Sequence, residues 1–162
     1  MIELTQEDAA IRIVVALVLG AAIGLEREWK AKSAGFRTYA LVSEGAALFM
    51  IGAILMYNEV RGSGGTTGDP VRVASTVVQG IGFLAGGVIF TARGHVKGLT
   101  TAAGVWVTSA IGVLVGMGFF VVAVIGTIAT LIVLGLFRYV EHWMPVPDPE
   151  EGHSNVPDRL ED

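Results

Sequence analysis

An acidic residue inside an apolar segment is the feature of this sequence that most directly indicates chemistry. Glu44 lies between Val42-Ser43 and Gly45-Ala46-Ala47, about two helical turns into that segment. A carboxylate at the centre of a membrane helix costs about 2.5 kcal/mol or more, so it must be paired, hydrated or protonated. One reading is an ion pair with Arg27 or Arg37, and the other is a cation or proton site. Both readings stay open at the level of the sequence.

Small and polar residues recur at helical spacing in two later segments that a short loop joins. Residues three or four positions apart lie on one face of a helix, so each set forms a stripe. The first stripe is Arg72, Ser75, Gln79, Gly82 and Gly86, and the second is Thr101, Gly104, Thr108, Gly112 and Gly116. We expect the two stripes to face each other. They either pack the helices together or, through Gln79, Thr101 and Thr108, line a polar cavity.

Glycines spaced four residues apart give a more specific packing signal. The pairs are Gly20–Gly24, Gly82–Gly86 and Gly112–Gly116. Glycine weakens a helix in water by about 1 kcal/mol relative to alanine, but in a bilayer it lets two helix backbones approach closely. The three pairs therefore predict helix contacts inside a membrane.

Residue sets that carry out catalysis or hold metals do not stand out. The sequence contains no cysteine, and His95, His142 and His153 have no spacing typical of metal ligands. Magnesium favours one or two carboxylates together with several waters, so Glu44 is the candidate ligand in the apolar region. We expect no resident cofactor, no nucleic-acid partner and no enzymatic activity.

The composition determines which elements must position these residues. Hydrophobic residues make up 52% of the 162 residues, charged residues 16%, and the mean hydropathy is +0.64. A membrane helix needs about 20 apolar residues, so the sequence predicts an all-α integral membrane protein with a bundle of five transmembrane helices. The expected spans are 9–25, 36–57, 73–92, 99–115 and 118–137, within a transmembrane domain of residues 1–143. Residues 144–162 read as a disordered acidic tail.

Basic residues indicate how the helices are oriented. Cytoplasmic loops carry an excess of Lys and Arg. Such residues gather after the first span (Arg27, Lys30, Lys32, Arg37), after the third (Arg93, Lys97) and after the fifth (Arg138), against Arg12, Arg61 and Arg72 on the other side. The N-terminus is therefore expected outside and the C-terminus in the cytoplasm.

Four blocks of the sequence resemble those of a known family. They are Gly24-Leu25-Glu26-Arg27-Glu28, then residues 34–42 (AGFRTYALV), then Arg72-Val73-Ala74 followed by residues 80–89 (GIGFLAGGVI), and finally residues 96–103 (VKGLTTAA) with Trp106. In this order, across residues 20–112, they resemble the MgtC/SapB family of bacterial membrane proteins.

The resemblance implies a five-span, multi-pass protein of the bacterial inner membrane, linked to growth in low magnesium and to survival of pathogens inside macrophages. It implies a regulator rather than a magnesium channel, with the F-type ATP synthase as a partner of the best-known member. Many members carry a cytoplasmic C-terminal domain similar to ACT domains. This sequence has its acidic tail there, so it resembles a short form of the family.

Two functional hypotheses follow. The first is a non-enzymatic membrane protein of magnesium homeostasis that acts through contacts with the ATP synthase, a magnesium transporter or further copies of itself. The second is a small Mg²⁺ or H⁺ transporter or channel with a polar path centred on Glu44. The polar residues expected to matter are Arg27, Arg37, Glu44, Gln79, Arg93, Lys97, Thr100, Thr101 and Thr108.

Overall fold

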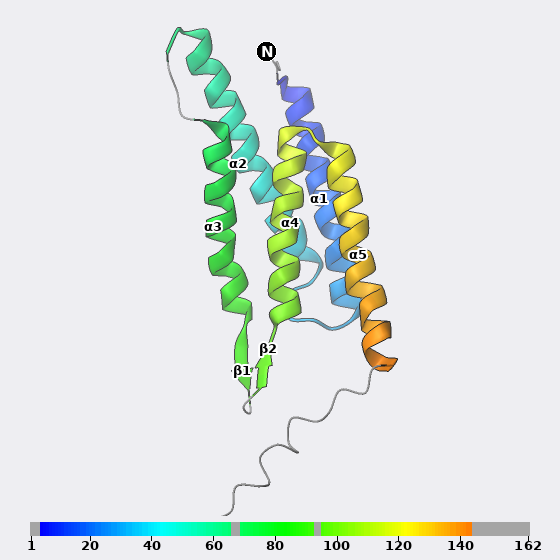
Figure 1. The fold of residues 1–162 in the computed structure, drawn as a ribbon. Coiled ribbons are helices and arrows are strands. Elements are labelled where there is room, and N and C mark those ends of the chain that lie inside the picture. Colours follow the sequence, from blue (N-terminus) through cyan, green and yellow to red (C-terminus); the bar gives the residue numbers. More distant parts are fainter. Residues whose placement is uncertain (1–3, 66–68, 93–94, 144–162) are drawn as a thin grey trace, which may run out of the picture.

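The computed structural model describes residues 4–65, 69–92 and 95–143, with only the backbone described for residues 91, 92, 95 and 137–143. Within these ranges the chain forms five helices and one short pair of strands (Figure 1). In chain order they are α1 (Gln6–Trp29), α2 (Phe36–Gly62), α3 (Pro70–Val88), β1 (Phe90–Ala92), β2 (His95–Lys97), α4 (Leu99–Met117) and α5 (Phe120–Trp143).

The predicted class, a helical membrane bundle, is confirmed. Helices α1 to α4 are each long and apolar enough to cross a membrane. The apolar part of α5 is Phe120–Leu136, but the whole helix has 24 residues. At about 1.5 Å per residue it is longer than the roughly 30 Å of a hydrocarbon core.

Local sequence signals explain where the helices begin and end. Thr5 and Asp8 form a reciprocal capping box at the start of α1. Asp69 accepts a hydrogen bond from the Val71 N–H at the start of α3, where Pro70 is the first helical residue. Gly118 ends α4 with a φ of 89°, a conformation that glycine adopts without steric cost.

The core of the bundle lies where α1, α2 and α4 cross. Helix α4 is the most enclosed of the candidate membrane spans, since 61% of its apolar 18-residue stretch is buried. In Figure 1 it stands between α3 and the side formed by α1 and α5. A methyl group added at Gly20 of α1 would lie 2.6 Å from the Tyr39 carbonyl oxygen of α2. One added at Gly112 of α4 would overlap the Ser43 carbonyl oxygen. Backbones thus meet here without intervening side chains.

The expected pairing of the stripes on α3 and α4 is wrong. The α4 stripe is buried, but Gly112 and Gly116 contact α2 at Ser43 and Ala47. The α3 stripe is exposed, and an added methyl group at its glycines, Gly82 and Gly86, would meet no atom within 4 Å. Helix α3 buries Ile81 and Ala85 instead. Its apolar residues supply the contact with the bundle, which turns its small and polar residues outward.

The connection between α3 and α4 also differs from the expected simple loop. Strands β1 and β2 pair antiparallel, with Phe90 opposite Lys97. Aromatic and β-branched residues such as Phe90, Thr91 and Val96 favour extended backbone, so the third helix ends at Val88 rather than running to residue 92. This hairpin and the loop between α1 and α2 lie at the same end of the bundle, opposite the N-terminus (Figure 1).

The α2–α4 contact yields a stability prediction. Gly112→Ala should destabilise the bundle by about 1–3 kcal/mol, because the new methyl group overlaps backbone that cannot move independently. Gly52→Ala is the matched control, since the same change on α2 meets no atom within 4 Å. Thermal unfolding midpoints in detergent measure both. A Gly112 variant as stable as the Gly52 variant would contradict the proposed packing.

Candidate functional site: a basic cavity at one end of the bundle

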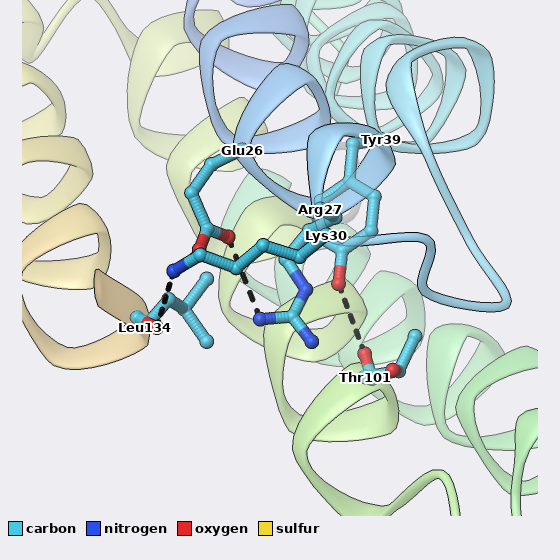
Figure 2. Close-up of polar contacts among 6 residues, drawn as sticks. All are labelled: Glu26, Arg27, Lys30, Tyr39, Thr101 and Leu134. Carbon is cyan, nitrogen blue, oxygen red and sulfur yellow. Dashed lines mark hydrogen bonds and ion pairs between the residues drawn. The ribbon is translucent and has the colours of Figure 1, made fainter. Parts of the chain in front are cut away.

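A buried arginine lies in the last turn of α1. Arg27 is 3% exposed, and its Nη1 donates a hydrogen bond of 3.4 Å to Oε2 of Glu26. Its Nε is buried and has no hydrogen-bond partner among the described residues. Figure 2 shows the guanidinium reaching from α1 toward the first turn of α4. A guanidinium has five N–H donors, and the buried Nε of Arg27 is one that no described residue satisfies.

The carboxylate of Glu26 is shared between two cations. Its Oε1 lies 2.5 Å from Nζ of Lys30, which also donates to the Leu134 carbonyl oxygen at 3.4 Å. Lys30 therefore connects α1 to α5 (Figure 2). One negative charge thus serves both Arg27 and Lys30, so the cluster carries an excess of positive charge.

A buried tyrosine joins α2 to the same place. Tyr39 is fully buried, and its hydroxyl donates to the Thr101 carbonyl oxygen at 3.2 Å. Gly104 makes room for this contact, since a methyl group added there would lie 2.5 Å from the hydroxyl. In Figure 2 the tyrosine hydroxyl and the Arg27 guanidinium lie on the same side of the cluster. Tyr39 therefore fixes the start of α4 relative to the end of α1.

The loop after α1 begins with a strained residue. Ala31 has a φ of 50°, in the left-handed region. Its N–H donates to the Glu28 carbonyl oxygen at 2.9 Å, and the Lys32 N–H donates to that of Arg27 at 3.1 Å. These two bonds form a Schellman motif, which satisfies the final carbonyl groups of the helix. The turn places Lys32 and Ser33 beside the first turn of α4.

Helix α4 begins without a side-chain cap. Its N-cap residue, Gly98, has a φ of 90° and lies so close to the Val88 carbonyl oxygen that no larger residue fits. Glycine has no side chain with which to accept a hydrogen bond from the first N–H groups of the helix. The helix dipole adds partial positive charge at this point.

These elements surround a cavity of about 620 Å³ that opens at the surface. The described residues of its lining are basic, hydroxyl-bearing or apolar, and none of them is acidic. The lining residues are Arg27, Ala31, Lys32, Ser33, Phe90, Val96, Lys97, Gly98, Leu99, Thr100 and Thr101.

The cavity brings together four of the residues expected to matter from the sequence, namely Arg27, Lys97, Thr100 and Thr101. Arg93 lies outside the described residues. Arg37 is exposed on α2 and does not line the cavity.

The other expected polar residues are dispersed. Glu44 is half-buried and has no ion pair with Arg27 or Arg37 in the described part of the chain. Gln79 is exposed on α3. The buried Thr108 hydroxyl donates to the Gly104 carbonyl oxygen at 2.8 Å within its own helix. The structure therefore does not bring Gln79, Thr101 and Thr108 into one cavity.

A second buried arginine was missed as a site by the sequence reasoning. Arg12 is 8% exposed, and its Nη1 donates to the Gly116 carbonyl oxygen at 2.7 Å. It thus satisfies a free carbonyl at the C-terminus of α4, where the helix dipole favours a cation. An arginine inside an apolar run is the signal that could have revealed this role.

No metal centre is formed by the described residues, among which no group of three His, Asp or Glu side chains is close enough to hold an ion. Glu44 remains an isolated candidate ligand.

The bundle with its basic end defines a multi-pass helical membrane protein. Comparison with known families is more specific: the MgtC family model matches residues 13–143, and the chain belongs to this family. No solved structure matches the chain.

Three similar proteins come from different bacteria. The protein named "Putative magnesium transporter YhiD" of Escherichia coli (strain K12) is 41% identical over 128 residues, which is 79% of this chain and 60% of that protein. Protein slr0014 of Synechocystis is 43% identical over 77% of this chain and 50% of its own length. Protein MgtC of Salmonella typhimurium (strain 14028s) is 41% identical over 75% and 48%. The chain thus spans about half to three-fifths of these relatives.

The strained turn of the cavity wall can be tested. Ala31→Gly should stabilise the protein by about 0.5–1 kcal/mol, because glycine adopts a positive φ without the cost of about 1–2 kcal/mol that alanine carries. Ala22→Gly, in the middle of α1, is the control and should destabilise by about 1 kcal/mol. Thermal unfolding midpoints in detergent compare the two. Equal losses of stability in both variants would contradict this conformation of Ala31.

Proposed function

We propose that this chain is a non-enzymatic protein of the bacterial inner membrane that takes part in adaptation to low magnesium through contacts with other membrane proteins. Its membership of the MgtC family supports the link to magnesium, since the name of YhiD describes a magnesium transporter. The MgtC family is not named for an enzymatic activity. We extend the link to magnesium and the absence of an enzymatic activity to this chain as part of the proposal.

The outward stripe of α3 is the observation that carries the proposal. Gly82 and Gly86 offer a smooth helix surface with no neighbouring atom within 4 Å. Ser75 and Gln79 continue this surface and are also exposed. In lipid an unpaired glutamine amide is costly, whereas an adjacent helix from another protein can satisfy it. The pattern that packs α4 inside the bundle is therefore available on α3 for a partner.

Three partners fit this surface: the F-type ATP synthase implied by the family resemblance, a magnesium transporter, and a second copy of the chain. Each offers membrane helices, which the stripe requires. We further propose that residues 1–143 form one transmembrane domain with the N-terminus outside and the basic end in the cytoplasm. The clustering of the two basic connections at one end supports this orientation.

A bulky residue on the stripe tests the proposal. Gly86→Leu should leave the monomer as stable as wild type, because the site is open, but should block close approach of a partner helix. A deletion strain that expresses the Gly86 variant should then grow in low magnesium no better than the strain without the protein. Cross-linking of the variant to other membrane proteins should be lost as well. Gly52→Leu on α2, also at an open position, is the control. Full rescue by the Gly86 variant would overturn the proposal.

Ion transport is the second candidate function. Glu44 favours it, because this half-buried carboxylate lies within a membrane helix and has no ion pair in the described ranges. A carboxylate in such a place can exchange a proton or coordinate a cation.

Flux measurements distinguish transport from regulation by contact. Protein in liposomes should give no Mg²⁺ or H⁺ flux under an imposed gradient if the first proposal holds. Flux that Glu44→Gln abolishes, and that the exposed-site control Glu59→Gln retains, would instead establish transport. Fluorescent indicators inside the vesicles report both ions.

A further inference from the structure

We propose that the basic cavity binds a phosphate-bearing anion between the end of α1, strand β2 and the first turn of α4. The proposal concerns a site separate from the outward stripe of α3 and does not depend on the partner proposed there.

The charge of the lining is the first argument. Arg27 comes from α1, Lys32 from the loop that follows it, and Lys97 from β2, and all three line the cavity. None of the described residues that line it is acidic. The nearest carboxylate, Glu26, is already shared between Arg27 and Lys30. Two parts of the chain that are distant in the sequence, residues 27–32 and β2, thus contribute positive charge to one space, which suits an anion.

The state of Arg27 is the second argument. Its side chain is 4% exposed, its Nε has no partner among the described residues, and its hydrogen bond to Glu26 is long at 3.4 Å. A buried charge with unused donors is costly unless it is paired with an acceptor of good geometry. Phosphate oxygens accept bidentate hydrogen bonds from guanidinium, so a bound phosphate would satisfy donors that the chain leaves unused.

The start of α4 supplies further donors. Gly98 gives the helix no side-chain cap, so the first N–H groups are left for another acceptor. Such a helix N-terminus combines free donors with the positive end of the dipole, which suits phosphate. Thr100 and Ser33, which carry hydroxyl groups, belong to the same lining. Together with the basic side chains they offer more hydrogen-bond donors than a simple halide ion would use.

The remaining lining is apolar and suits a phosphate group that is attached to a larger, partly apolar molecule. Phe90, Val96 and Leu99 line the cavity and are 51%, 56% and 57% exposed. With a volume of about 620 Å³, the space also exceeds a bare phosphate group. The shared chemistry is a phosphate group, whose source is either an anionic lipid headgroup or a soluble phosphate compound.

Binding to the purified full chain in phosphatidylcholine nanodiscs tests the proposal. Two probes are titrated by calorimetry: inorganic phosphate and short-chain dioctanoyl phosphatidic acid. Lys97→Gln and Lys32→Gln change exposed residues, so the fold should persist. Each should weaken binding about tenfold, since a hydrogen bond to a charged group contributes about 1.5–3 kcal/mol. Arg37→Gln removes an exposed charge at the same end but outside the cavity and should change affinity by less than about twofold.

The outcomes separate the two sources. Saturable binding of inorganic phosphate that Lys97→Gln weakens supports the site with a soluble ligand, and saturable binding of phosphatidic acid alone, weakened by the same change, supports it with a lipid headgroup. Binding of either probe that Lys97→Gln leaves unchanged overturns the proposal. If neither probe binds saturably, the proposal is overturned. It is equally overturned if Arg37→Gln weakens binding as much as Lys97→Gln, because the attraction would then be general and not due to the cavity.

Discussion

The close approach of α1, α2 and α4 is the constraint on which the rest of the structure depends. Helices in lipid gain little from hydrophobic burial, so they associate where small residues allow backbones to touch. Gly20 and Gly112 both meet the α2 backbone, at Tyr39 and Ser43 respectively. Because the crossing leaves no room for an added methyl group, it fixes how the three helices are positioned along their axes relative to one another.

The fixed positions of the helices along their axes determine which polar side chains meet at the two ends of the bundle. With α2 packed against both α1 and α4, Tyr39 reaches the Thr101 carbonyl oxygen at one end. At the other end Arg12 reaches the Gly116 carbonyl oxygen. Each contact joins α4 to a different helix, and each is buried. Polar side chains thus mark both ends of the most enclosed helix, while its middle is packed by glycine, threonine and serine.

The sequence predicted the class, the family and the buried stripe of α4, because helical spacing and composition act locally. It did not predict which way the α3 stripe faces, since the same spacing suits both a neighbour in the chain and a neighbour outside it. The roles of Arg12 and Tyr39 also escaped prediction, because each depends on a contact with a distant helix. Arg37 and Arg27 appeared equivalent in the sequence, but only Arg27 ends on the inner side of its helix.

The outward stripe and the basic cavity are joined by one short stretch of the chain. Helix α3 buries Ile81 and Ala85, and its partly buried Ala74 and Val77 pack against α2 and α4. Its chain continues through β1 into β2, where Phe90 pairs with Lys97. The Gly98 turn, closely packed on the Val88 carbonyl oxygen, connects this pair to α4. The cavity is therefore lined by Lys97 from the hairpin that joins α3 to α4, and by Arg27 and Thr101 from the helices of the α1, α2 and α4 crossing.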